Sequence, residues 1–159
     1  MNAHPNDHFV ATAIIPARVI NIAVDTAYLF SQPNGQYAGQ GIYMMDNNVL
    51  GNGPNAGEGS TELTTQVTVG FGLAFNVFPI DSLGAQGDSV EIVGIELSNG
   101  TNIFGNFGWP KPPNPASSYQ WVGYVSKQGS CTYQLKIGVS IGGNPVQYYW
   151  WDPFLVANA

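Results

Sequence analysis

Residues 132–141 read TYQLKIGVSI, and their alternation decides the fold class. The apolar positions are Tyr133, Leu135, Ile137, Val139 and Ile141, separated by Gln134, Lys136, Gly138 and Ser140. A two-residue period is typical of a β-strand that has one buried face and one solvent face. Residues 61–69, TELTTQVTV, repeat the pattern with Leu63, Thr65, Val67 and Val69 on the predicted buried face.

Strands predicted in the same way account for most of the chain. They cover residues 9–15, 18–25, 41–45, 73–78, 89–97, 120–126 and 147–151. Gly- and Asn-rich turns separate them, and the Asn99-Gly100 pair predicts a hairpin turn. No long segment repeats apolar residues with the period of a helix. We therefore predict an all-β fold, an antiparallel β-sandwich of the jelly-roll or immunoglobulin-like type.

The chain has 159 residues, which predicts a single domain over residues 1–159. Residues 1–8 are polar and are expected to be a flexible N-terminal segment. The N-terminal sequence lacks a basic region followed by an apolar run, so we expect no secretory signal. No stretch approaches the about 18 apolar residues of a membrane span. We expect a cytoplasmic protein, with export by a signal-less route left open.

Charge is sparse: four basic and ten acidic residues give a formal net charge of −6. Nucleic acids and anionic membrane surfaces require clustered cations, so we expect neither as a partner. A surface that is polar but mostly uncharged suits neutral, hydroxyl-rich ligands. It also has little long-range repulsion, which favours self-association.

Catalytic residues are poorly represented in the sequence. Both histidines, His4 and His8, lie in the N-terminal segment, so a nucleophile with a histidine base is not expected. Cys131, the only cysteine, is interpreted as a small buried hydrophobe. Glu91 and Glu96 have opposite parity on one predicted strand, and only a bulge near Gly94 would bring both to one face. We predict that the protein is not an enzyme.

The sequence indicates a metal site as weakly as it indicates a catalytic site. Asp46, Asn47 and Asn48 form a small oxygen cluster that suits calcium, and the alternative is ordinary turn-forming side-chain chemistry. Ligands for a structural zinc site are absent. We expect no cofactor and no resident metal, with calcium left open.

Aromatic residues offer the best candidate contacts for a sugar. Residues 104–115, FGNFGWPKPPNP, place Asn106 and Trp109 in a proline-stiffened loop. An aromatic face packs on the apolar C–H surface of a sugar, and amides bind its hydroxyls. The alternative is that Trp109 plugs one end of the sandwich.

The C-terminal stretch YYWWDPFLV, residues 148–156, contains four consecutive aromatic residues. Alternation sends Tyr148 and Trp150 to one face and Tyr149 and Trp151 to the other. One pair should fill the core, and the other should lie at a loop, a subunit contact or a ligand. Pro153 has no amide donor, which predicts a sheet edge or a bulge there.

Six short motifs along residues 19–156 carry a family resemblance. They are VINIAVDTAYLF, IYMMDN, GEGSTEL, SVEIVGIEL, CTYQLKIGV and YWWDPFLV. In this order they resemble the AidA/PixA family of bacterial inclusion-body proteins, whose last strand carries a Trp-Asp-Pro-aromatic motif. The resemblance implies a β-sandwich, bacterial origin, quorum-linked expression and no established catalytic residues. With three methionines, a methionine-storage role is not expected.

We therefore expect a non-enzymatic, lectin-like protein that binds neutral carbohydrate or glycoconjugates and forms a homo-oligomer. The predicted contact residues are Asp46, Asn48, Asn106, Trp109 and Asp152. The alternative is a self-assembling inclusion-body or storage protein without a small-molecule ligand. A hydrolase that uses paired carboxylates is the third hypothesis.

Overall fold

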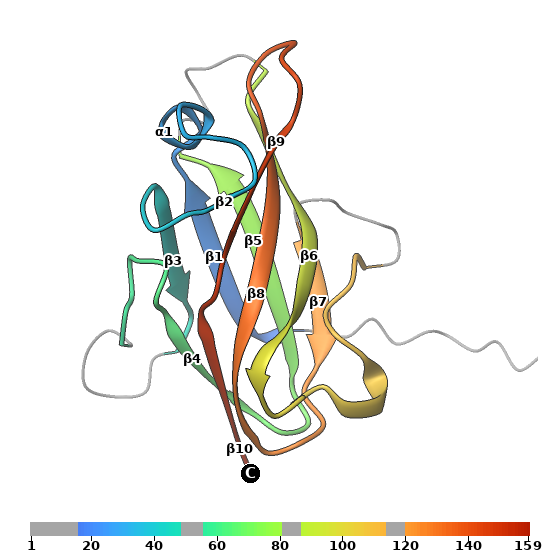
Figure 1. The fold of residues 1–159 in the computed structure, drawn as a ribbon. Coiled ribbons are helices and arrows are strands. Elements are labelled where there is room, and N and C mark those ends of the chain that lie inside the picture. Colours follow the sequence, from blue (N-terminus) through green and yellow to red (C-terminus); the bar gives the residue numbers. More distant parts are fainter. Residues whose placement is uncertain (1–15, 49–55, 81–86, 114–119) are drawn as a thin grey trace, which may run out of the picture.

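Two β-sheets form the protein in a computed structural model that describes residues 16–48, 56–80, 87–113 and 120–159 (Figure 1). The first, sheet A, has the order β3-β1-β5-β7. Its strands are β1 (Pro16–Val24), β3 (Ile42–Asp46), β5 (Gly72–Pro79) and β7 (Gln120–Tyr124). The predicted segment 1–8 and the predicted strand 9–15 lie outside the described residues.

Sheet B is built around the long strand β8 (Gly129–Ser140). On one side β8 pairs with β6 (Ser89–Gly100), and on the other with β9 (Gln147–Trp151) and then β10 (Phe154–Asn158). The outer strands are β2 (Gln36–Tyr37), which pairs with β9, and β4 (Thr64–Thr68), which pairs with β10. Asp152 and Pro153 separate β9 from β10. β10 lies between β8 and β4, and the pairing with β8 keeps the same register from Trp151 to Phe154, so neither the predicted sheet edge nor the predicted bulge is found at Pro153.

Both sheets are mixed, so the prediction of a wholly antiparallel sandwich is wrong. Three strand pairs are parallel: β1 with β5, β4 with β10, and β2 with β9. Each pair joins strands that are distant in the sequence, and alternation within a strand does not determine the direction of its neighbour. The jelly-roll or immunoglobulin-like assignment stays a prediction.

The core lies between the two sheets and is filled by the predicted apolar faces. Leu63, Thr65 and Val67 of the stretch that leads into β4 are buried, as are Tyr133, Leu135, Ile137 and Val139 of β8. Phe75 of sheet A packs edge-on against Tyr133 of sheet B with ring centroids 5.6 Å apart. The Trp151 Nε1–H of β9 donates to Met44 Sδ of β3 at 3.1 Å, which joins the sheets directly.

One short helix interrupts the β structure within the described residues. The helix α1 (Thr26–Phe30) follows β1, and Asp25 Oδ1 caps it by accepting the Tyr28 N–H at 3.0 Å. A single 3₁₀ turn, η1 (Gly105–Phe107), lies between β6 and β7. No helix in the part of the chain that the structure describes has the length and apolar character needed to cross a membrane.

Two irregularities shape β6. The register with β8 shifts between Ile92 and Gly94, which confirms the predicted bulge, and again between Leu97 and Asn99. The predicted hairpin at Asn99-Gly100 is wrong, because both residues still pair with β8. Gly100 has φ +96°, and a Cβ there would lie 2.5 Å from the Ser130 carbonyl oxygen. The glycine therefore permits a bulge and close strand contact instead of a turn.

Candidate functional site

Asp46 and Asn48 lie at the end of β3. Asp46 Oδ1 accepts the Asn48 N–H at 2.9 Å, and Asp46 Oδ2 accepts the Thr65 hydroxyl at 2.7 Å. Both carboxylate oxygens therefore already bond to neighbouring residues. This arrangement matches the alternative of turn-forming side-chain chemistry. Among the described residues, no group of three or more His, Cys, Asp or Glu side chains could hold a metal ion.

Asn106 and Trp109 lie beside β7, at the edge of sheet A opposite β3. Asn106 is exposed on η1, and Trp109 is half-buried against the core, edge-on to the buried Phe104 with centroids 4.8 Å apart. Lys111 bridges to Val122, which fixes this loop along β7. The position of Trp109 agrees with the predicted plug of the sandwich more closely than with an exposed sugar platform.

Asp152 lies between β9 and β10, beside Tyr37 of β2. The Tyr37 hydroxyl donates to Glu62 Oε1 at 3.3 Å. Partial burial, together with the carboxylates of Asp152 and Glu62, raises the pKa of Tyr37 to about 12. Asp152 is thus part of an acidic group of side chains around a tyrosine hydroxyl.

The five predicted contact residues do not form one site. Asp46 is on β3 and the Trp109 loop is on β7, at opposite edges of sheet A. With β1 and β5 between them, these edges are about 14 Å apart at the usual strand spacing. Asp152 belongs to sheet B. The strand order therefore places these residues in three separate regions, too far apart for one sugar ring to contact them all.

The aromatic C-terminal stretch divides as predicted. Tyr149 and Trp151 are buried in the core, whereas Tyr148 is exposed and Trp150 is half-buried on the outer face of sheet B. Trp150 packs edge-on against Tyr37 with centroids 5.1 Å apart, and Lys136 Nζ lies 5.3 Å from the centroid of the Tyr148 ring. We call Tyr37, Trp150 and Tyr148 the aromatic row of sheet B.

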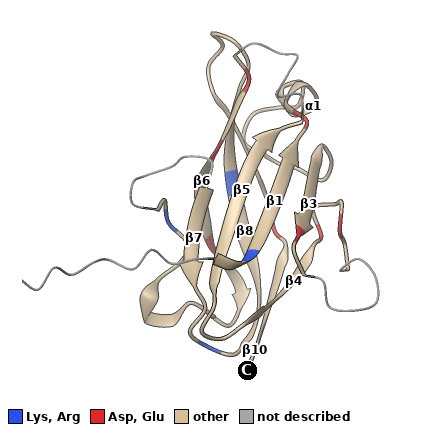
Figure 2. Ribbon diagram, turned by 180° about the vertical axis from the view of Figure 1, so that it is seen from behind, with Lys and Arg blue, Asp and Glu red and all other residues tan. Residues whose placement is uncertain are grey.

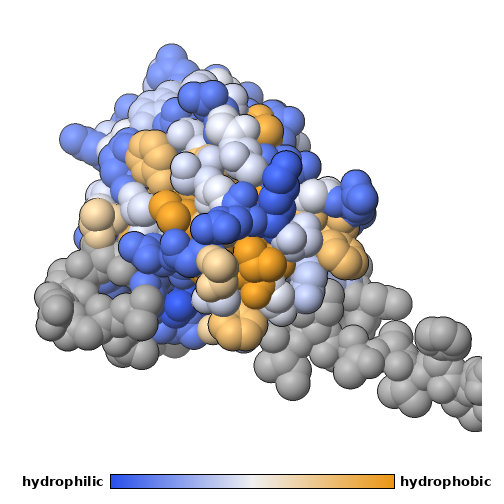
Figure 3. Space-filling view, turned by 90° about the horizontal axis from the view of Figure 1, so that it is seen from below, coloured by the Kyte–Doolittle hydropathy of each residue, from blue (hydrophilic) through white to orange (hydrophobic). Residues whose placement is uncertain are grey.

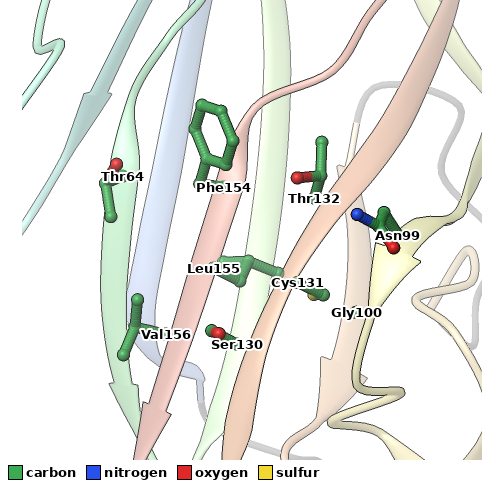
Figure 4. A pocket seen from close by; sticks show the side chains of 9 residues that line it. All are labelled: Thr64, Asn99, Gly100, Ser130, Cys131, Thr132, Phe154, Leu155 and Val156. Carbon is green, nitrogen blue, oxygen red and sulfur yellow. The ribbon is translucent and has the colours of Figure 1, made fainter.

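A shallow groove of about 290 Å³ lies on sheet B beyond Asp152 (Figure 4). Its lining crosses β4, β10, β8 and the end of β6 and comprises Thr64, Asn99, Gly100, Ser130, Cys131, Thr132, Phe154, Leu155 and Val156. Burial raises the pKa of the Cys131 thiol to about 11, so the thiolate is scarce at neutral pH. The groove thus offers hydroxyls and apolar surface without an activated nucleophile.

A second hollow, of about 300 Å³, lies at the junction of α1 and β3. It is lined by Asp25, Tyr28, Gly39, Gln40, Gly41, Ile42, Tyr43, Gly59, Ser60 and Thr61, and we call it the tyrosine pocket. No local sequence pattern predicts this pocket, because its walls come from three segments of the chain. The Asp25-Thr26 cap before an aromatic residue was the available local signal.

The outer face of sheet A carries its own apolar row. Tyr43 and Phe78 both pair with Ala23 of β1, so the three side chains follow one another across the sheet. Tyr43 is 43% exposed and Phe78 is 39% exposed. Met45, 38% exposed, lies in the next row on β3. We call Tyr43, Ala23 and Phe78 the apolar row of sheet A.

Paired-carboxylate hydrolysis finds no support in the geometry of β6. After the bulge, Glu91 is opposite Gly138 and Glu96 is opposite Gln134, on one face of β8. Four residues of strand separate these positions by about 13 Å. Glycosidase carboxylates lie roughly 5–9.5 Å apart.

Comparisons with known proteins place the chain as follows. Residues 18–147 match a protein family described as a domain of unknown function, DUF8788. None of the curated proteins matches the sequence. The fold is similar to the crystal structure of an inclusion body protein, PixA, from Burkholderia cenocepacia J2315, with a TM-score of 0.67 and 15% sequence identity. The similarity covers 89% of this chain and 94% of that chain, and it confirms the fold that the AidA/PixA resemblance implied.

Proposed function

This chain belongs to the DUF8788 family, and we propose that it is a non-enzymatic protein that assembles densely with copies of itself in the cytoplasm. The PixA protein, which has the same fold, is an inclusion body protein, and this supports the proposal. The observation that carries it is the presence of exposed apolar side chains on the outer faces of both sheets.

The number of apolar faces determines whether the assembly is closed or extended. The two sheets form the two layers of the fold (Figure 1), and the apolar row of sheet A and the aromatic row of sheet B lie on their outer faces. A molecule with one apolar face forms a closed dimer. A molecule with two faces that contact each other heterologously grows into an extended array. The placement of the two rows therefore supports the proposal of dense accumulation.

Sparse charge favours the same behaviour. The Lys, Arg, Asp and Glu positions are scattered over a ribbon that is mostly uncharged (Figure 2). Viewed from below, hydrophobic side chains form separate patches between hydrophilic ones (Figure 3). Neighbouring copies thus meet little electrostatic repulsion at close approach.

The experiment compares variants of each row by sedimentation velocity over a range of concentrations. Phe78→Ser removes the sheet A contact and Tyr148→Ser the sheet B contact. We expect large assemblies from the wild type and mostly monomers from each single variant and from the double variant, because every heterologous contact uses both rows. Leu97→Ser is the matched control, because Leu97 is 38% exposed but pairs with the inward-facing Tyr133 of β8. A wild-type protein that stays monomeric at every concentration contradicts the proposal.

A second candidate function is noncovalent recognition of neutral carbohydrate. The specific observation that favours it is the tyrosine pocket, which combines two exposed aromatic rings with carboxylate, amide and hydroxyl groups. The residues first predicted for this role, Asp46, Asn48, Asn106, Trp109 and Asp152, do not line it. A glycan array with and without a chelator tests the function and the calcium requirement together.

A further inference from the structure

The glycine at the base of the tyrosine pocket holds an aromatic ring in place. Gly41 has φ +80°, and a Cβ there would lie 2.5 Å from Cδ1 of Tyr28. The Tyr28 ring therefore lies directly over the Gly41 backbone. Tyr43, two residues further on, cannot have its Cα more than roughly 7 Å from that of Gly41. The fold thus brings two tyrosine rings from α1 and β3 together at one hollow.

Backbone hydrogen bonds fix the opposite wall. The Gly59 N–H donates to the Met44 carbonyl at 2.7 Å, and the Met44 N–H donates to the Ser60 carbonyl at 3.3 Å. The Asp25 N–H donates to the Gly41 carbonyl at 2.8 Å and anchors the near wall. A hollow held on both sides by main-chain bonds loses little conformational entropy when a ligand enters it.

Polar groups at this hollow retain hydrogen-bonding capacity. The Tyr28 hydroxyl donates to Gln40 Oε1 at 3.2 Å, which leaves the Gln40 Nε2 group without a partner among the described residues. Asp25 Oδ1 accepts the helix-capping bond, and within the same described part of the chain Asp25 Oδ2 accepts none. A donor and an acceptor are therefore both available to a ligand's hydroxyl groups.

The charge and size of the hollow narrow the class of ligand. Its lining contains Asp25 but no Lys or Arg, so phosphorylated and acidic ligands are disfavoured. A volume of about 300 Å³ is at the lower end of ligand pockets and suits a ligand of a single ring. A pyranose has an apolar C–H face for a tyrosine ring and hydroxyls for the amide and the carboxylate.

From this geometry we propose that the tyrosine pocket binds one neutral pyranose ring, stacked on Tyr43 or Tyr28 and hydrogen-bonded by Gln40 and Asp25. The proposal rests on the second candidate function, carbohydrate recognition, and names the site at which it occurs. It does not depend on self-assembly.

The test is saturation-transfer difference NMR with three probes, measured at protein concentrations below those that cause assembly. The probes are methyl α-D-mannopyranoside, methyl β-D-glucopyranoside and methyl β-D-galactopyranoside. We expect transfer to at least one probe and about tenfold weaker binding for Tyr43→Ala, which removes one stacking surface. Gly41→Ala should weaken binding as well, because its methyl group displaces the Tyr28 ring. Tyr148→Ala, which removes an equally exposed ring on the other sheet, should bind as the wild type does.

The possible outcomes test the pocket assignment and the carbohydrate function separately. If the wild type shows transfer to none of the three probes, both the carbohydrate function and the pocket assignment are overturned. If the wild type binds a probe and both Tyr43→Ala and Gly41→Ala bind it equally well, the pocket assignment alone is overturned. Far-UV circular dichroism of each variant shows whether weaker binding reflects a lost contact or a lost fold.

Discussion

At the scale of single residues, Tyr133 is an exception to the rule that buried polar groups are paired. Its side chain is fully buried in the core, and its hydroxyl has no hydrogen-bond partner among the described residues. Burial, with smaller contributions from Cys131 and Asp46, raises its pKa well above the usual value for tyrosine. An unpaired buried hydroxyl costs free energy that a phenyl ring of the same shape does not.

We therefore predict that Tyr133→Phe raises the free energy of unfolding by about 1 kcal/mol. The matched control is Tyr149→Phe, because the Tyr149 side chain is also buried but its hydroxyl donates to the Gln32 carbonyl at 3.0 Å. That variant should be destabilised by about 1 kcal/mol. Urea unfolding followed by circular dichroism measures both. Equal effects of the two substitutions would contradict this account.

The raised pKa of Tyr37 predicts that the stability of the fold depends on pH. Its folded-state pKa of about 12 exceeds the usual tyrosine pKa of 10.0, so the folded state holds this proton more tightly than the unfolded state does. The stability that Tyr37 contributes is thus complete below pH 10 and is lost as the pH rises through 12. In an NMR titration of labelled tyrosine, we expect Glu62→Gln to lower the Tyr37 pKa part of the way toward 10, since burial and Asp152 are unchanged. A Tyr37 that titrates near 10 in the wild type would refute the proposed contact with the carboxylates.

At the scale of elements, strand β9 shows how alternation distributes large side chains. Trp151 is fully buried and bonds to Met44 of the other sheet, whereas Trp150 is half-buried on the outer face. Two adjacent residues of the same type therefore have different structural roles.

We predict that Trp151→Ala lowers the free energy of unfolding by about 3–5 kcal/mol, because it removes a packed side chain that the core cannot replace. Trp150→Ala should cost less than about 2 kcal/mol, since one side of the ring already faces solvent. Thermal and urea unfolding of the two variants provide the comparison. A larger loss for Trp150→Ala would mean that the strand faces are assigned the wrong way round.

The strands of the two sheets show which structural features the sequence predicts and which it does not. Leu63, Thr65 and Val67 were assigned to the buried face by alternation alone, and the structure buries all three. The parallel pairing of β1 with β5 was missed, because it depends on contacts between segments that are about 55 residues apart. Helix α1 was missed as well. Five residues are too few to show a helical period, and tertiary packing stabilises so short a helix.

The candidate site shows the same contrast between local features, which the sequence predicts, and long-range contacts, which it does not. Pro153 was expected at a sheet edge or a bulge, and the structure instead has a short break between β9 and β10 with no shift in the pairing to β8. The tyrosine pocket needs α1, β3 and residues 59–61 together, so no single stretch of sequence contains it. The predicted contact residues were chosen by chemical type within loops, and the strand order then separated them.

At the scale of the whole molecule, surface charge and apolar contact have opposite effects on assembly. The formal net charge is −6 at pH 7, so neighbouring copies repel each other weakly at long range. The apolar row of sheet A and the aromatic row of sheet B attract at short range. The balance between these two effects sets the concentration at which assemblies appear.

Because the sequence pI is about 4.4, lowering the pH from 7 toward that value removes the net charge and should lower the concentration needed for assembly. Added salt at pH 7 should act in the same direction, since it screens repulsion between copies and leaves apolar contacts intact. Light scattering over a dilution series measures the onset of assembly, and circular dichroism of the same samples confirms that the fold is retained. If salt dissolves the assemblies instead, ion pairs and not the two apolar rows hold the copies together, and the proposed contact surfaces are wrong.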